Sequence, residues 1–155
     1  MRMQALELKI PPPAFAVLIA GAMWGISLVA SLLEVPAFIR VAAAATIALA
    51  GGGFSLAGVI SFRRAETTVN PMKPETTSSL VCSGVYRFTR NPMYLGVLFI
   101  LVAWAVFLSS AWALLGPLAF VHYINRFQIA PEERALAAMF DPGYSAYRSR
   151  SRRWL

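Results

Sequence analysis

The sequence predicts an all-α integral membrane protein: a helical bundle of about four transmembrane helices, capped at one end by a cytoplasmic loop and a C-terminal helix. Composition is the first indication, because 58% of the 155 residues are hydrophobic and 14% are charged. Soluble domains hold roughly 45–50% apolar and 25% charged residues. The second indication is that most charges lie in two polar segments, residues 63–91 and 131–155. We expect one membrane domain over residues 1–155.

The first apolar stretch, residues 14–33, carries no charge. Twenty helical residues at 1.5 Å each cover the roughly 30 Å of hydrocarbon in a bilayer, so this stretch is expected to span the membrane. A cleaved signal peptide is the alternative, since Arg2 and Lys9 precede the stretch. The stretch is too long for that, and no clear small-residue cleavage site follows it.

The second predicted span is residues 41–62, and it contains a glycine-rich stretch at residues 50–58. Glycines in membrane helices allow a neighbouring helix to approach closely. They equally allow a ligand to approach the backbone. Helix packing is the favoured interpretation.

The third apolar stretch is too long for one span and about right for two short ones, which we place at residues 93–108 and 112–129. Ser109 and Ser110 mark the expected turn between them. Pro117 is expected to bend the fourth helix, since neighbouring helices can satisfy the carbonyl that a proline leaves free.

Four spans place both termini on one side of the membrane, and the charges support this topology. Thirteen of the fourteen lysines and arginines fall on that side, and Arg40 is the exception. Positive charges concentrate on the cytoplasmic side, so both termini are expected to be cytoplasmic. Arginine outnumbers lysine twelve to two, a bias typical of GC-rich bacterial genomes. We therefore expect an inner-membrane protein.

Composition disfavours a nucleic-acid-binding protein and a disulfide-stabilised protein. An isoelectric point near 10.3 also suits nucleic-acid binding, but the apolar stretches leave no room for a soluble core. The single cysteine excludes an internal disulfide. No metal site and no nucleic-acid partner are expected.

The start of the third span has a structural interpretation. Asparagine is a favoured N-cap and proline a favoured first helical residue, so Asn91 and Pro92 make a good helix start. Tyr94 would lie in the interfacial aromatic belt. Arg87 and Arg90 would face lipid phosphates.

The end of the fourth span carries polar residues on one predicted face. If the helix continues through Pro131, five of them fall within about 120° of arc; they are His122, Asn125, Arg126, Glu132 and Glu133. Such a face should look into protein or a water-filled cavity. The alternative is a solvated helix end, with a new helix beginning at Pro131. A short hairpin would bring this face near Arg90, Asn91 and Tyr94.

Two ordered motifs carry a resemblance to a known group of enzymes. "LVCSGVYRFTRNPMYLG", residues 80–96, and "EERALAAMFDPGYSAYRSRSRRWL", residues 132–155, flank the predicted hairpin. They resemble the signatures of the isoprenylcysteine carboxyl methyltransferase and phospholipid methyltransferase superfamily of small membrane enzymes. The resemblance covers residues 67–154. It departs at Asn91, where most members have histidine; asparagine donates a hydrogen bond but carries no charge.

The resemblance implies transfer of a methyl group from S-adenosylmethionine, leaving S-adenosylhomocysteine, to a lipophilic acceptor. The hairpin, the preceding loop and the tail would enclose the cofactor. Leu80, Val81 and Tyr86 would line the adenosine pocket. The methionine moiety would be flanked by residues at the start of the third span: Asn91, Pro92, Met93 and Tyr94. Glu132 would take the ammonium, with Glu133 beside it, and an arginine such as Arg90 suits the carboxylate.

Two residues are candidates for the chemistry itself. Arg126 would hold an anionic acceptor or headgroup near the sulfonium, or else anchor the helix to phospholipid phosphates. His122, the only histidine, has an unperturbed pKa near 6.5 and suits a general base; such a histidine more often bonds to a neighbouring helix. The acceptor stays open among phospholipid amines, isoprenoid acids, quinol-like hydroxyls and thiols. The alternative functions are a non-catalytic membrane scaffold that binds lipid or a partner, and a small transporter or sensor subunit.

Overall fold

The computed structural model describes residues 7–30, 33–65 and 79–155, and within these ranges it is helical and contains no strand. The helices are α1 (Pro12–Val29), α2 (Ala37–Arg64), α3 (Pro92–Leu108), α4 (Leu115–Ile124), α5 (Ala130–Phe140) and α6 (Gly143–Arg148). Three shorter helical segments are η3 (Gly84–Arg87), η4 (Ala111–Leu114) and η5 (Asn125–Ile129). The all-α prediction is therefore confirmed for the described residues.

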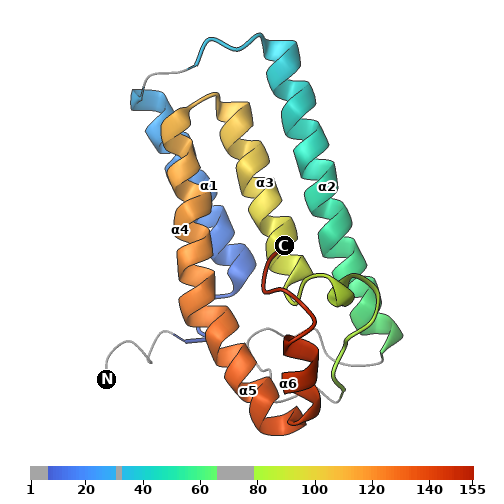
Figure 1. The fold of residues 1–155 in the computed structure, drawn as a ribbon. Helices are drawn as coiled ribbons and strands as arrows, with labels where there is room; N and C mark the ends of the chain where they lie inside the picture. The colour runs from blue at the N-terminus through green and yellow to red at the C-terminus, as the bar shows by residue number, and fades with distance from the viewer. Residues whose placement is uncertain (1–6, 31–32, 66–78) are drawn as a thin grey trace.

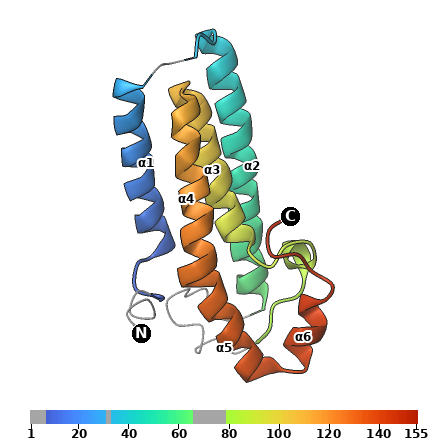
Figure 2. The same cartoon turned by 60° about the vertical axis from the view of Figure 1, so that its left-hand side comes forward.

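Helices α1 to α4 lie side by side along one bundle (Figures 1 and 2). Residues 33–36, which precede α2, and the turn before α4 lie at one end, and α5 and α6 lie at the other. We call this second end the polar end. The arrangement confirms that a hairpin brings the start of α3 and the end of α4 to the same end of the bundle.

Two helices, α1 and α2, are long and apolar enough to cross a membrane, and α3 is a shorter apolar helix of 17 residues. Four transmembrane spans therefore remain a prediction. The first span, predicted to end at residue 33, ends as a helix at Val29. Pro117 lies in the first turn of α4, which begins at Leu115, so it does not bend the middle of that helix.

Helices α2 and α3 form the closest helix pair, and glycine makes this possible. A Cβ atom built on Gly51 of α2 would lie 2.6 Å from the carbonyl oxygen of Gly96 on α3. Such a distance is a steric clash, so the two backbones can approach only without side chains here. The packing interpretation of the glycine-rich stretch holds at Gly51. A Cβ on Gly52 or Gly53 would meet open space.

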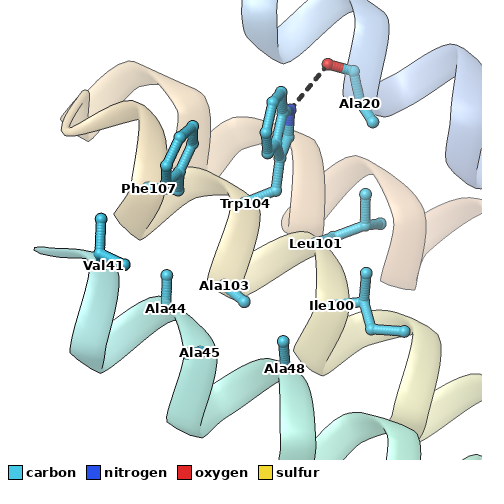
Figure 3. A pocket seen from close by; sticks show the side chains of 10 residues that line it. All are labelled: Ala20, Val41, Ala44, Ala45, Ala48, Ile100, Leu101, Ala103, Trp104 and Phe107. Atoms are coloured by element: carbon cyan, nitrogen blue, oxygen red, sulfur yellow. Dashed lines mark hydrogen bonds between the residues drawn. The ribbon is translucent and has the colours of Figure 1, made fainter.

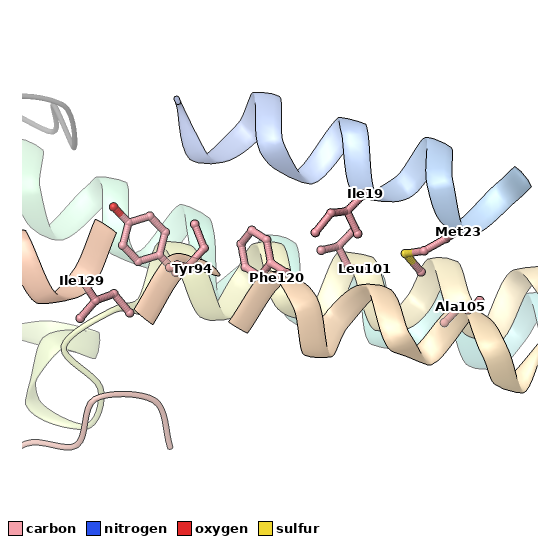
Figure 4. Close-up of a cluster of buried hydrophobic side chains, with 9 residues drawn as sticks. Ile19, Met23, Tyr94, Leu101, Ala105, Phe120 and Ile129 are labelled. Carbon is pink, nitrogen blue, oxygen red and sulfur yellow. The ribbon is translucent and has the colours of Figure 1, made fainter. Parts of the chain in front are cut away.

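One buried apolar cluster joins α1, α3 and α4 and continues to the polar end (Figure 4). Its members are Ile19, Met23, Tyr94, Leu101, Ala105, Ala113, Phe120, Ile124 and Ile129. Tyr94 and Ile129 form the polar-end part of this cluster in Figure 4. The packed core therefore leads directly into the polar end, and its rigidity fixes the position of Tyr94.

A candidate site at the polar end of the bundle

The fourth helix runs without interruption from α4 through η5 into α5, and η5 is a turn of π-helix. Pro131 lacks an N–H, so the carbonyl of Phe127 loses the donor four residues later. The backbone N–H of Leu8 donates to this carbonyl at 3.1 Å. The chain thus passes through Pro131 because an N-terminal residue satisfies the carbonyl that proline leaves free. Turns of π-helix are frequent at functional sites.

The extra residue of the π turn also rotates the side chains of α5 by about 100° relative to those of α4. For this reason the five polar residues predicted to share one face do not do so. Glu132 and Glu133 face the start of α3 and the C-terminal segment. Arg126 pairs with Glu7, and His122 is exposed on α4. This part of the predicted site was wrong in its geometry.

The first contact of the site joins α3 to α5. The hydroxyl of Tyr94 donates a hydrogen bond to Oε1 of Glu132 over 2.5 Å. Gln128, one turn before Glu132 and 1% exposed, also hydrogen-bonds with Tyr94. The prediction that Tyr94 and Glu132 meet is confirmed. A carboxyl group is therefore held at a fixed point by a phenol that is itself buried in the core.

Glu132 is the electrostatically unusual group of this cluster. Burial is the main reason that its pKa is raised to about 8. The hydrogen bond from Tyr94 lowers the pKa, and the neighbouring Glu133 raises it further. The carboxyl is consequently mostly protonated at neutral pH. A cation placed beside it would favour the ionised form and displace the proton.

Tyr86 of η3 lies within electrostatic range of Glu132. Burial, with Tyr147 and Glu132 nearby, raises the pKa of Tyr86, so its hydroxyl stays neutral. The hydroxyl of Tyr147 donates to the backbone carbonyl of Tyr86 at 2.7 Å. This bond ties η3 to α6 beside the carboxyl.

Glu133 has a different environment from its neighbour. Its carboxylate pairs with Arg90 at 3.3 Å and with Arg153 at 2.5 Å. The side chains of Arg90 and Glu133 are each 11% exposed. Arg90 also donates to the backbone carbonyls of Arg148 and Ser151. The predicted approach of Arg90 to Glu133 is confirmed, and this ion pair joins α5 to the chain before α3.

The C-terminal segment, residues 149–155, lies along the chain that leads into α3. The backbone N–H of Arg90 donates to the backbone carbonyl of Arg152 at 2.8 Å. The indole N–H of Trp154 donates to Oδ1 of Asn125 at 3.1 Å. The side-chain amide of Asn91 donates to the carbonyl of Arg153 at 2.9 Å. Asn91 precedes α3 as predicted, but its side chain does not cap the helix.

The remaining predicted cofactor residues lie on either side of this cluster. Val81 and Tyr86 are buried against Tyr144 and Tyr147 of α6, and Leu80 packs on the same group. These five residues hold the preceding loop against the tail.

Pro92 and Met93 instead pack on α2. A Cβ atom on Gly58 would lie 2.8 Å from Cγ of Met93 and 3.3 Å from Cγ of Pro92. Their observed contact is therefore a helix-packing contact.

Arg126 forms no ion pair with Glu132 or Glu133 in the described part of the chain. Glu7 accepts from Arg126 at 3.3 Å and from Arg134 at 2.5 Å, and the Glu7 side chain is 14% exposed. The two arginines form an anion-binding pair, with the carboxylate of Glu7 bound between them.

Sequence reasoning missed Gln128, Arg153 and Glu7. Gln128 had a usable signal, because it lies four residues before Glu132 and so shares its helix face. Arg153 and Glu7 had no such signal in the sequence, because Glu133 lies 20 residues from Arg153 and Arg126 lies 119 residues from Glu7.

The fold and the cluster define a small helical protein with two helices long and apolar enough to cross a membrane, and with a polar site where the helix ends and the C-terminal segment meet. The chain belongs to the phospholipid methyltransferase family, whose model matches residues 39–142. The match includes Arg90, Tyr94, Glu132 and Glu133. It ends before α6 and the C-terminal segment.

Another comparison concerns a bacterial relative. An uncharacterized protein of Haemophilus influenzae is 46% identical over 63 residues, which are 41% of this chain and 100% of that protein. No solved structure matches the chain significantly. The family indicates a methyltransferase that associates with membranes.

Proposed function

We propose that this protein transfers a methyl group from S-adenosylmethionine to a lipophilic or amphiphilic acceptor that enters from the membrane, and releases S-adenosylhomocysteine. The observation that carries the proposal is the environment of Glu132. Its carboxyl is held by Tyr94, whereas the nearby arginines pair with Glu133. Among the described residues, Glu132 has no ion-pair partner. It is therefore the carboxyl that is free to bind a ligand's ammonium group.

The surrounding groups fit the other parts of the cofactor. Nε of Arg90 is buried and has no hydrogen-bond partner within the described part of the chain. It is a donor for the cofactor's carboxylate. The rings of Tyr86 and Tyr94 suit a sulfonium, which gains roughly 0.5–2 kcal/mol over an aromatic face. Val81 and Leu80 suit the adenine as apolar neighbours.

When bound, S-adenosylmethionine would supply a methyl group on a positively charged sulfur. A lone pair of the acceptor would bond in line to the methyl carbon as the carbon–sulfur bond breaks, and S-adenosylhomocysteine would leave as a neutral thioether. The residues of this chain contribute by positioning, because such a displacement needs no covalent help from the protein. Arg126 and Arg134 would hold an anionic acceptor headgroup in the place now taken by Glu7. His122 is exposed on α4, and its role as a general base stays a prediction.

Saturable binding of the cofactor by the purified full chain in detergent tests the proposal. We expect Glu132→Gln to weaken binding of S-adenosylhomocysteine about 10- to 100-fold, because hydrogen bonds to charged groups are worth about 1.5–3 kcal/mol. Glu34→Gln, at the opposite end of the bundle, is the matched control and should bind like the parent chain. A scaffold or a transporter subunit would show no saturable binding in either.

The acceptor is identified by a separate measurement. Membranes that contain the protein are incubated with methyl-labelled S-adenosylmethionine, and the lipid extract is separated. Label in one lipid-soluble species, lost in Glu132→Gln, supports the proposal. Label confined to soluble compounds contradicts a lipophilic acceptor.

A further inference from the structure

An apolar groove lies between α1 and α2, with α3 as its floor (Figure 3). Its volume is about 580 Å³, within the roughly 300–1,000 Å³ of small-molecule sites. The residues that line it are Ala20, Val41, Ala44, Ala45, Ala48, Ile100, Leu101, Ala103, Trp104 and Phe107. They come from the first part of α2 and the last part of α3, with Ala20 from α1. The groove therefore lies in the half of the bundle away from the polar end.

The floor of the groove is held in place by specific contacts. The rings of Trp104 and Phe107 stack with centroids 5.4 Å apart. The indole N–H of Trp104 donates to the carbonyl of Ala20 on α1 at 3.1 Å (Figure 3). This bond joins α3 to α1 across the groove, so the shape is fixed by side chains on both sides.

Arg40 lies at the end of the groove. Its guanidinium is 5.7 Å from the ring centroid of Phe107, and the next residue, Val41, also lines the groove. Arg40 has no ion-pair partner in the described ranges, and its buried Nε has no hydrogen-bond partner there. An arginine near the end of a membrane helix extends its guanidinium to the interface, where lipid phosphates lie. Arg40 is therefore a candidate partner for an anion.

The dimensions of the groove match one leaflet. Arg40 and Ala48 are eight residues apart, which is about 12 Å along a helix. One leaflet contributes about 15 Å of hydrocarbon, half of the roughly 30 Å core. An acyl chain with its headgroup at Arg40 would thus extend along the groove.

We propose that the groove binds an anionic phospholipid of the leaflet opposite the polar end, with an acyl chain over Ala44, Ala45 and Ala48 and the phosphate on Arg40. Basic pockets between membrane helices recognise anionic headgroups in this way. The proposal is independent of methyl transfer, because its residues lie at the other end of the bundle. A second copy of the chain is the competing occupant, with its exposed Glu34 supplying the anion.

Native mass spectrometry of the full chain in mild detergent tests the headgroup contact. Palmitoyl-oleoyl phosphatidylglycerol and the matching phosphatidylcholine are titrated separately. We expect about fivefold tighter binding of phosphatidylglycerol, the effect of roughly one basic residue at a membrane surface. Arg40→Gln should remove this preference and Arg40→Lys should keep most of it. An unchanged preference in Arg40→Gln overturns the proposal.

A second pair of variants tests the groove. Ala45 lines it and is exposed, so Ala45→Phe fills it without disturbing the core. Ala50 is an exposed alanine on the same helix that does not line the groove, and Ala50→Phe is the control. We expect Ala45→Phe to lose the tight lipid and Ala50→Phe to keep it. Equal lipid binding in both, or a lipid-free dimer that Ala45→Phe dissociates, overturns the proposal.

Discussion

Glu132 and Glu133 are adjacent and chemically identical, yet the tertiary structure separates their roles. Glu133 is bound by Arg90 and Arg153 and holds three segments together. Glu132 accepts a hydrogen bond from the neutral hydroxyl of Tyr94, and burial raises its pKa. A charge that is already paired contributes to structure, whereas an unpaired and desolvated carboxyl is a candidate for ligand binding.

The raised pKa of Glu132 predicts how cofactor affinity depends on pH. The ionised form binds the cofactor's ammonium. In the free protein the pKa of Glu132 is about 8, so this form becomes dominant only when the pH exceeds that value. Affinity for S-adenosylhomocysteine should therefore rise roughly tenfold per pH unit from pH 6 and level off above pH 8. Isothermal titration at several pH values measures this. A profile equally steep in Glu132→Gln would assign the titration to another group.

Tyr94 offers a milder test of the same contact. Tyr94→Phe keeps the ring in the core and removes the hydrogen bond to Glu132, so we expect cofactor affinity to fall about fivefold for a loss of about 1 kcal/mol. The melting temperature should change little. Tyr94→Ala is unsuitable, because removing a buried aromatic side chain lowers the free energy of unfolding by about 3–5 kcal/mol. Parent-like affinity in Tyr94→Phe would remove Tyr94 from the site.

At the scale of the elements, the start of α3 was predictable and the course of the fourth helix was not. Pro92 in the first turn gives a local signal that places the helix start within one residue. The π turn at residues 125–129 has no such signal, because it depends on Leu8 satisfying the carbonyl of Phe127. The predicted polar face failed for the same reason.

The α2–α3 contact predicts opposite effects for two glycines. Gly96→Ala would drive a methyl group into the backbone of α2 near Gly51 and Ser55, and overpacking costs about 1–3 kcal/mol. Gly52→Ala meets open space and should stabilise the helix by roughly 0.5–1 kcal/mol. Thermal unfolding of both variants in detergent compares them. A stable Gly96→Ala protein would mean that the two helices are farther apart than the structure shows.

At the scale of the whole molecule, the proposed topology predicts which residues are reachable from each side of the membrane. Cys82, the single cysteine, is exposed at the polar end and should react with an impermeant maleimide only in inverted vesicles. Glu34→Cys in a Cys82→Ser background should react only in right-side-out cells. Labelling of both positions from one side would refute the cytoplasmic placement of the termini.

The sequence by itself determined the helical class, the start of α3, the family motifs and the residue types of the site. These features depend on apolar runs and short-range spacing, which act within a few helical turns. Only the tertiary structure decided that Glu132 meets Tyr94, that Glu133 pairs with Arg90 and Arg153, and that Arg126 pairs with Glu7. Those partners are 20 to 119 residues apart, so their pairing depends on how the helices rotate and pack against one another.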